Sequence, residues 1–234
     1  MIFNKQSVHK WIWIGLFAIA FAMIEAAVVI YIRKIYYPEG FLFPLKLIGS
    51  DIAMVEISRE FATMLLLVSI ALVADKRFIQ AFAWFIYAFA IWDIFYYVFL
   101  YVFLGWPQNL LVWDILFLLP FTWVGPVIAP IINSLSMIIL AIVVITKKEN
   151  IRFKAYHWIF LIIGALIVIG AYTKDYLQFM LTDFNIWQLL GGGSSIDIIE
   201  KAATFIPDNF AWSIFTIGVA THLLVIVDLI RRKN

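Results

Sequence analysis

Stretches of about 20 apolar residues recur along this chain, and each is long enough to cross the hydrocarbon core of a bilayer. Of the 234 residues, 65% are hydrophobic and only 14% are charged. A soluble domain of this size cannot bury that much apolar surface, so the composition indicates an integral membrane protein whose first partner is the lipid bilayer. The formal charge is +2, and no basic tract is typical of nucleic-acid binding, so we expect no nucleic-acid partner.

The fold class we predict is all-α: one polytopic membrane bundle of six or seven helices that occupies residues 1–234. The apolar segments lie at 11–32, 53–74, 78–104, 127–146, 155–173 and 210–230. A further segment, 109–122, is shorter and contains Asp114 and Pro120, so we expect either a short span or a re-entrant half-helix there. Between the last two spans, residues 175–206 are typical of a helical segment that lies at the membrane interface.

Lys and Arg in short loops indicate which side of a membrane is cytoplasmic. Six and seven spans give similar counts, and both place the 147–154 loop and the C-terminal RRKN in the cytoplasm. With six spans the N-terminus is also inside, and Arg33, Lys34 and Lys46 then belong to an outer loop. We expect a prokaryotic cytoplasmic membrane, while the number of spans and the side of the N-terminus stay open at this point.

Charged residues interrupt the predicted membrane segments, at a cost of roughly 2.5–3.5 kcal/mol each on insertion scales. They are Glu25, Glu56, Arg59, Glu60, Asp93 and Asp114. A helical rise of about 1.5 Å per residue places all of them within roughly 5–15 Å of the same membrane surface. Because such groups persist where they face the interior of a bundle, we predict one cluster built from four segments. Further candidates to line it are Tyr96, Tyr97, Asn133 and Ser134.

Three interpretations of this cluster stay open. In the first it is a structural ion network closed by Arg59. In the second it is a polar cavity that binds a cation or relays protons, with Arg59 as the counter-ion that tunes the acids. In the third it is a metal or catalytic site, since several carboxylates suit a hard divalent cation such as Ca²⁺, Mg²⁺ or Mn²⁺.

The sequence offers little support for an enzyme. It has no cysteine, which excludes disulfides, thiolate metal sites and cysteine nucleophiles. It also lacks the familiar signatures of serine hydrolases, zinc proteases and nucleotide-binding loops, so we predict no cofactor and no catalytic residue. Our hypothesis is a membrane protein whose carboxylate cluster binds a cation or relays protons. The alternatives are a non-catalytic accessory subunit of a larger membrane complex and, third, a membrane enzyme that acts on a lipid or quinone.

Overall fold

The computed structural model describes residues 5–47, 49–147, 151, 153–190 and 196–232. Its described part contains six helices that are long and apolar enough to cross a membrane, so the chain is a polytopic integral membrane protein. They are α1 (Lys5–Tyr36), α2 (Ser50–Ala74), α3 (Phe78–Leu104), α4 (Ile128–Lys147), α5 (Ala155–Met180) and α8 (Trp212–Arg231). The predicted helical bundle is therefore confirmed, with six long helices.

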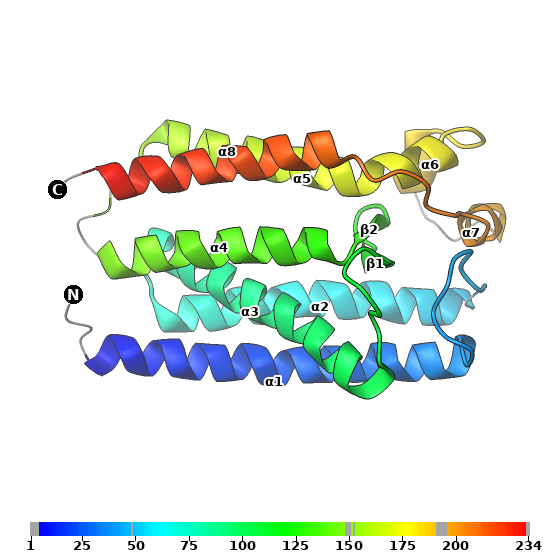
Figure 1. Cartoon of the computed structure of the whole chain (residues 1–234), viewed down its shortest axis with the longest axis horizontal. Helices are drawn as coiled ribbons and strands as arrows, with labels where there is room; N and C mark the ends of the chain where they lie inside the picture. Colours follow the sequence, from blue (N-terminus) through cyan, green and yellow to red (C-terminus); the bar gives the residue numbers. More distant parts are fainter. Residues whose placement is uncertain (1–4, 48, 148–150, 152, 191–195, 233–234) are drawn as a thin grey trace.

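The six helices run along the long axis of the molecule, and the first residues of α1 and the last residues of α8 lie at the same end (Figure 1). We call this the termini end. The opposite end carries a two-stranded hairpin and two short helices, and we call it the hairpin end (Figure 1). Its elements are β1 (Trp113–Phe117), β2 (Trp123–Pro126), α6 (Ile186–Leu190) and α7 (Ile196–Ala203). An even number of crossings returns the chain to its starting side, in agreement with this arrangement.

The hairpin corrects one prediction, because residues 109–122 form neither a short span nor a re-entrant helix. β1 pairs with β2 in antiparallel register, with Asp114 opposite Gly125 and Ile115 opposite Val124. The segment is too short to cross a bilayer. Its backbone polar groups are paired across the two strands instead, which is acceptable at membrane depth only where protein covers them. The protein packs closely against this hairpin at Gly125, where an added Cβ would lie 3.1 Å from the ring of Phe210.

The predicted interfacial segment 175–206 is divided differently from our expectation. Helix α5 continues to Met180, so the start of this segment belongs to a membrane helix. The rest contains α6 and α7, and residues 191–195 lie outside the described part of the chain. The helices α5 and α8 pack closely, because a Cβ on Gly218 would lie 2.9 Å from the backbone oxygen of Gly164. Small residues are typical of such close contacts between membrane helices.

Candidate functional site: a carboxylate cavity near the hairpin end

A cavity of about 250 Å³ lies among α1, α2, α3 and β1, and we call it the carboxylate cavity. All six charged residues that the sequence places at one depth line it: Glu25, Glu56, Arg59, Glu60, Asp93 and Asp114. Tyr96 and Tyr97 of α3 line it as well. The structure thus brings together residues that are up to 89 positions apart in the sequence, from Glu25 to Asp114.

Arg59 holds two of the carboxylates. Its Nε and Nη2 donate to Glu56 Oε2 at 3.1 and 2.8 Å, and its Nη1 donates to Glu25. The first contact follows from the helix, because residues three apart on α2 are neighbours on its surface. The second joins α2 to α1, and the side chain of Glu25 is 5% exposed. One guanidinium therefore binds two carboxylates from two helices, and its single positive charge is shared between them.

Arg33 holds a third carboxylate, a pairing that the sequence does not predict. Its Nη2 donates to Asp114 Oδ1 at 2.7 Å, and the two side chains are 7% and 1% exposed. With six spans the sequence predicts Arg33 in an outer loop, but α1 continues to Tyr36 and the side chain is buried against Asp114. The signal that could have revealed it is Pro38, because helices usually end at or before the residue that precedes a proline.

Glu60 is held by the backbone of the hairpin and not by a cation. Both of its carboxylate oxygens accept from the Leu118 N–H, at 3.1 and 2.9 Å. Leu118 directly follows β1, so the hairpin supplies this donor as well as Asp114. Within the described residues, Glu60 forms no ion pair.

Asp93 is also held by a neutral donor. Its Oδ2 accepts from the Ser134 hydroxyl at 2.8 Å, which joins α3 to α4. Asp93 is half-buried and lines the cavity. It forms no ion pair in the part of the chain that the structure describes. Ser134 thus belongs to the cluster as the partner of Asp93, although it does not itself line the cavity.

Asn133 is not part of this cavity, contrary to our expectation. It lines a separate, largely apolar cleft of about 370 Å³ whose walls include Phe85 of α3 and Tyr172 of α5. The reason is helical geometry, since neighbouring residues on α4 point about 100° apart at 3.6 residues per turn. Ser134 and Asn133 therefore face different spaces.

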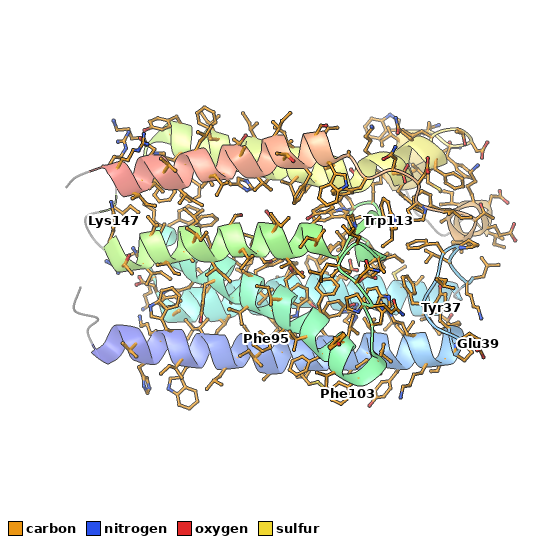
Figure 2. The ribbon with its side chains drawn as sticks, viewed as in Figure 1. Tyr37, Glu39, Phe95, Phe103, Trp113 and Lys147 are labelled. Carbon is orange, nitrogen blue, oxygen red and sulfur yellow. The ribbon has the colours of Figure 1, made fainter. Side chains whose placement is uncertain are left out.

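The cavity also contains residues from the segment that follows α1. The Tyr37 hydroxyl accepts from the Lys46 backbone N–H at 2.8 Å, and Lys46 Nζ lies 5.8 Å from the centre of the Tyr37 ring. Burial raises the pKa of Tyr37 above its ordinary value, so the phenol is neutral at physiological pH. Figure 2 shows Tyr37 at the hairpin end of the bundle. Lys46, which is exposed, marks the edge of the cavity on this side.

The charges that line the cavity do not balance. Five carboxylates face three cationic side chains, those of Arg33, Lys46 and Arg59. Glu60 and Asp93 are the two whose hydrogen-bond partners among the described residues are neutral donors and not cations. Among the described residues, no three His, Cys, Asp or Glu side chains lie close enough together to hold a metal ion. The arrangement is therefore a set of paired acids with two further acids beside it.

Comparisons with known proteins do not assign this chain: no family model matches it, and no match was found among curated proteins or solved structures. The site is therefore interpreted from its own chemistry.

Proposed function

We propose that this membrane protein takes up protons or a small cation in the carboxylate cavity, and that Glu60 and Asp93 are the groups that do so. The observation that carries the proposal is the excess of two carboxylates over cationic side chains in one cavity. Uncompensated charge in a low-dielectric space is costly, so a proton or a cation would relieve the excess.

The hydrogen bonds distinguish these two acids from the other three. Glu25, Glu56 and Asp114 each accept from a guanidinium, so each has a cationic partner without any ligand. Glu60 and Asp93 accept from an amide N–H and a hydroxyl, and these neutral donors leave oxygen lone pairs available. Intramembrane acids of this kind are typical of ion and proton pathways.

The distribution of basic residues supports an orientation for the site. With six spans, the loops and ends on the side of the termini contain Lys5, Lys10, Lys76, Arg77, Lys147, Lys148, Arg152, Lys154, Arg231, Arg232 and Lys233. The opposite side contains Arg33, Lys34, Lys46, Lys174 and Lys201. The first set is the larger, so we propose that the termini end faces the cytoplasm and that the cavity is reached from the other side.

The proposal is tested on the purified full chain in lipid nanodiscs by infrared difference spectroscopy of carboxyl groups during a pH titration. The comparison is between the parent protein, Glu60→Gln, Asp93→Asn and the double variant. Asp197→Asn is the matched control, because Asp197 is an exposed carboxylate of α7 outside the cavity. We expect each cavity variant to remove one signal of a carboxyl group that titrates inside the protein. The control should leave all of these interior signals in place.

A second measurement separates protons from other cations. Thermal unfolding is followed at fixed pH and ionic strength in sodium, potassium and choline chloride. If a cation binds, the small ion raises the unfolding temperature of the parent protein but not of the double variant. If the variants change neither the carboxyl signals nor the ion dependence, the proposal is wrong, and the cluster only fixes helix positions, as expected for an accessory subunit.

A further inference from the structure

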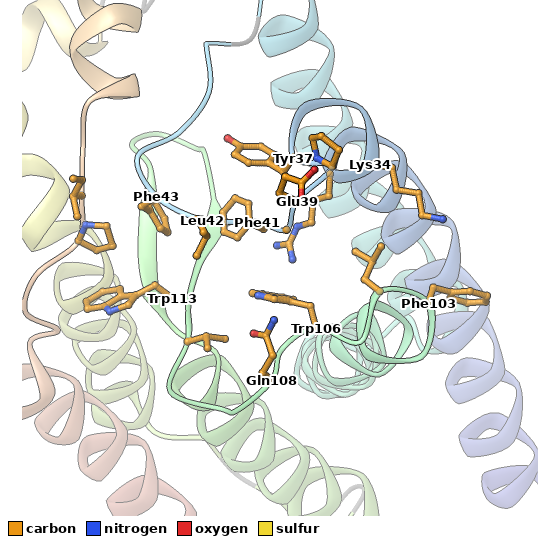
Figure 3. Close-up of a pocket in the computed structure, with 17 residues that line it drawn as sticks. Lys34, Tyr37, Glu39, Phe41, Leu42, Phe43, Phe103, Trp106, Gln108 and Trp113 are labelled. Carbon is orange, nitrogen blue, oxygen red and sulfur yellow. The ribbon is translucent and has the colours of Figure 1, made fainter.

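A second, larger pocket of about 1070 Å³ opens at the hairpin end, and we call it the hairpin-end pocket. It lies between the end of α1 with the segment that follows it, the end of α3, strand β1 and residues 206–207 (Figure 3). Among the described residues, Arg33, Tyr37 and Phe41 line both this pocket and the carboxylate cavity. Arg33 therefore lies in the wall between the two spaces.

Arg33 has a donor that the protein does not use. Its Nη2 is bonded to Asp114, whereas its Nη1 is buried and has no hydrogen-bond partner in the described part of the chain. The guanidinium carbon lies 3.8 Å from the ring centre of Trp106 and 4.3 Å from that of Phe41. These rings shield the charge from water without replacing a hydrogen-bond acceptor. A buried, unpaired N–H is unfavourable, so an incoming oxygen acceptor would be stabilised here.

The remaining polar groups of the pocket also favour an anion. Two basic side chains, Arg33 and Lys34, line it against one acidic side chain, Glu39. Gln108 adds an amide donor and lies beside Trp106 in Figure 3. A ligand with several acceptor oxygens and a negative charge fits this set better than a cation does.

The apolar part of the pocket indicates that the anion belongs to an amphiphile. Leu42, Phe103 and Ile206 line the pocket and are 71%, 52% and 61% exposed. Phe103 belongs to a membrane helix, and Figure 3 shows it at the edge of the pocket. Exposed apolar side chains beside a buried guanidinium match a molecule with a charged head and hydrocarbon chains.

We infer that the hairpin-end pocket binds the anionic headgroup of a membrane lipid, with a phosphate oxygen accepting from Arg33 Nη1 and the chains leaving over Phe103. This inference does not depend on the proposed function of Glu60 and Asp93. It has one internal consequence: Asp114 competes with the lipid for the charge of Arg33, so removal of the Asp114 charge should strengthen lipid binding.

The test is native mass spectrometry of the full chain in mild detergent, titrated with phosphatidylglycerol or phosphatidylcholine. Asp114→Asn is compared with the double variant Arg33→Gln/Asp114→Asn, which differs from it only in the guanidinium. We expect phosphatidylglycerol to bind the single variant about ten to a hundred times more tightly than the double variant, as one charge-assisted hydrogen bond implies. The parent protein should bind it more weakly than Asp114→Asn does and more tightly than it binds phosphatidylcholine.

Gln108→Glu extends the test if the double variant does not fold, because Gln108 is exposed and the change keeps its shape. The new charge should weaken phosphatidylglycerol binding about tenfold and leave phosphatidylcholine binding unchanged. The inference is overturned if the two lipids bind the parent protein equally, if Arg33 makes no difference, or if inorganic phosphate displaces the lipid at equal concentration.

Discussion

The termini end and the carboxylate cavity differ in how fully their acids are provided with donors and cations. At the termini end, Asp228 accepts from the Tyr156 hydroxyl at 2.7 Å and from Arg232 Nε at 2.8 Å, and its Oδ2 lies 2.7 Å from His157 Nε2. His157 Nδ1 accepts from the Lys154 N–H, so its Nε2 carries a proton and donates to Asp228. One carboxylate thus has three donors, whereas the carboxylate cavity has more acids than cations.

The same contrast extends to the helix ends. Lys147 Nζ donates to the backbone oxygens of Leu229 and Ile230 in the last turn of α8 and of Arg232 just after it, carbonyls that have no helical partner. Lys147 lies at the termini end in Figure 2. The charges at this end complete hydrogen bonds and stabilise the fold. Those of the carboxylate cavity leave an excess of negative charge, and the proposed function rests on this excess.

The largest effect is expected from Arg59→Gln, which removes the one cation shared by Glu25 and Glu56. Loss of one partner of a buried ion pair leaves a charge unpaired, so the free energy of unfolding should fall by about 3–5 kcal/mol. It is measured by denaturation in mixed detergent micelles. The double variant Arg59→Gln/Glu25→Gln should recover part of the loss. Equal stability of Arg59→Gln and the parent protein would show that the cavity charges do not interact.

An intermediate effect is expected from one chemical change made at both ends, from carboxylate to amide. Asp228→Asn removes the negative charge that three donors share, so the melting temperature should fall by a few degrees. Glu60→Gln/Asp93→Asn removes uncompensated charge, so the melting temperature should stay the same or rise. The measurement is thermal unfolding of the parent protein and the two variants in the same nanodiscs. A lower melting temperature in both variants would contradict the expected difference between the two ends.

The smallest effect is expected at the surface of the hairpin end, where Lys201 of α7 pairs with Asp183. The hydrogen bond from Lys201 holds the pKa of Asp183 below its ordinary value of 3.8. The pair therefore contributes stability above that pH, and the contribution is lost as the pH falls below it. Asp183→Asn should speed hydrogen exchange in α7 near neutral pH without changing the melting temperature of the bundle. Glu39→Gln removes an exposed carboxylate outside α7 and should leave that exchange unchanged.

The sequence predicts the membrane helices and the common depth of the acids well, because both are local properties. Hydropathy over about 20 residues marks a span, and a rise of about 1.5 Å per residue converts position into depth. This is enough to group Glu25 with Glu60 and Asp93. Asn133, the further candidate to line the cavity, points elsewhere, and neither hydropathy nor depth contains information on the direction of a side chain around its helix.

The partners of the acids could not be predicted in this way. Glu60 depends on a backbone N–H of Leu118, and every residue except proline has such a group, so no sequence pattern marks it. Arg33 depends on the continuation of α1 and on the approach of β1 from a distant part of the chain. The hairpin could not be predicted from its composition, because a short apolar run is equally compatible with a strand and with a buried helix.

The sequence by itself therefore determined that this protein lies in a membrane, and it predicted that the charged residues of its membrane segments form one cluster. Only the tertiary structure decided which acids receive a guanidinium and which are left with an amide or a hydroxyl. The physical reason is that depth follows from the rise of one helix. The pairing of the acids follows from the rotation of each helix and from the contacts between elements. It depends also on the hairpin, which brings Asp114 and the Leu118 N–H against the helices.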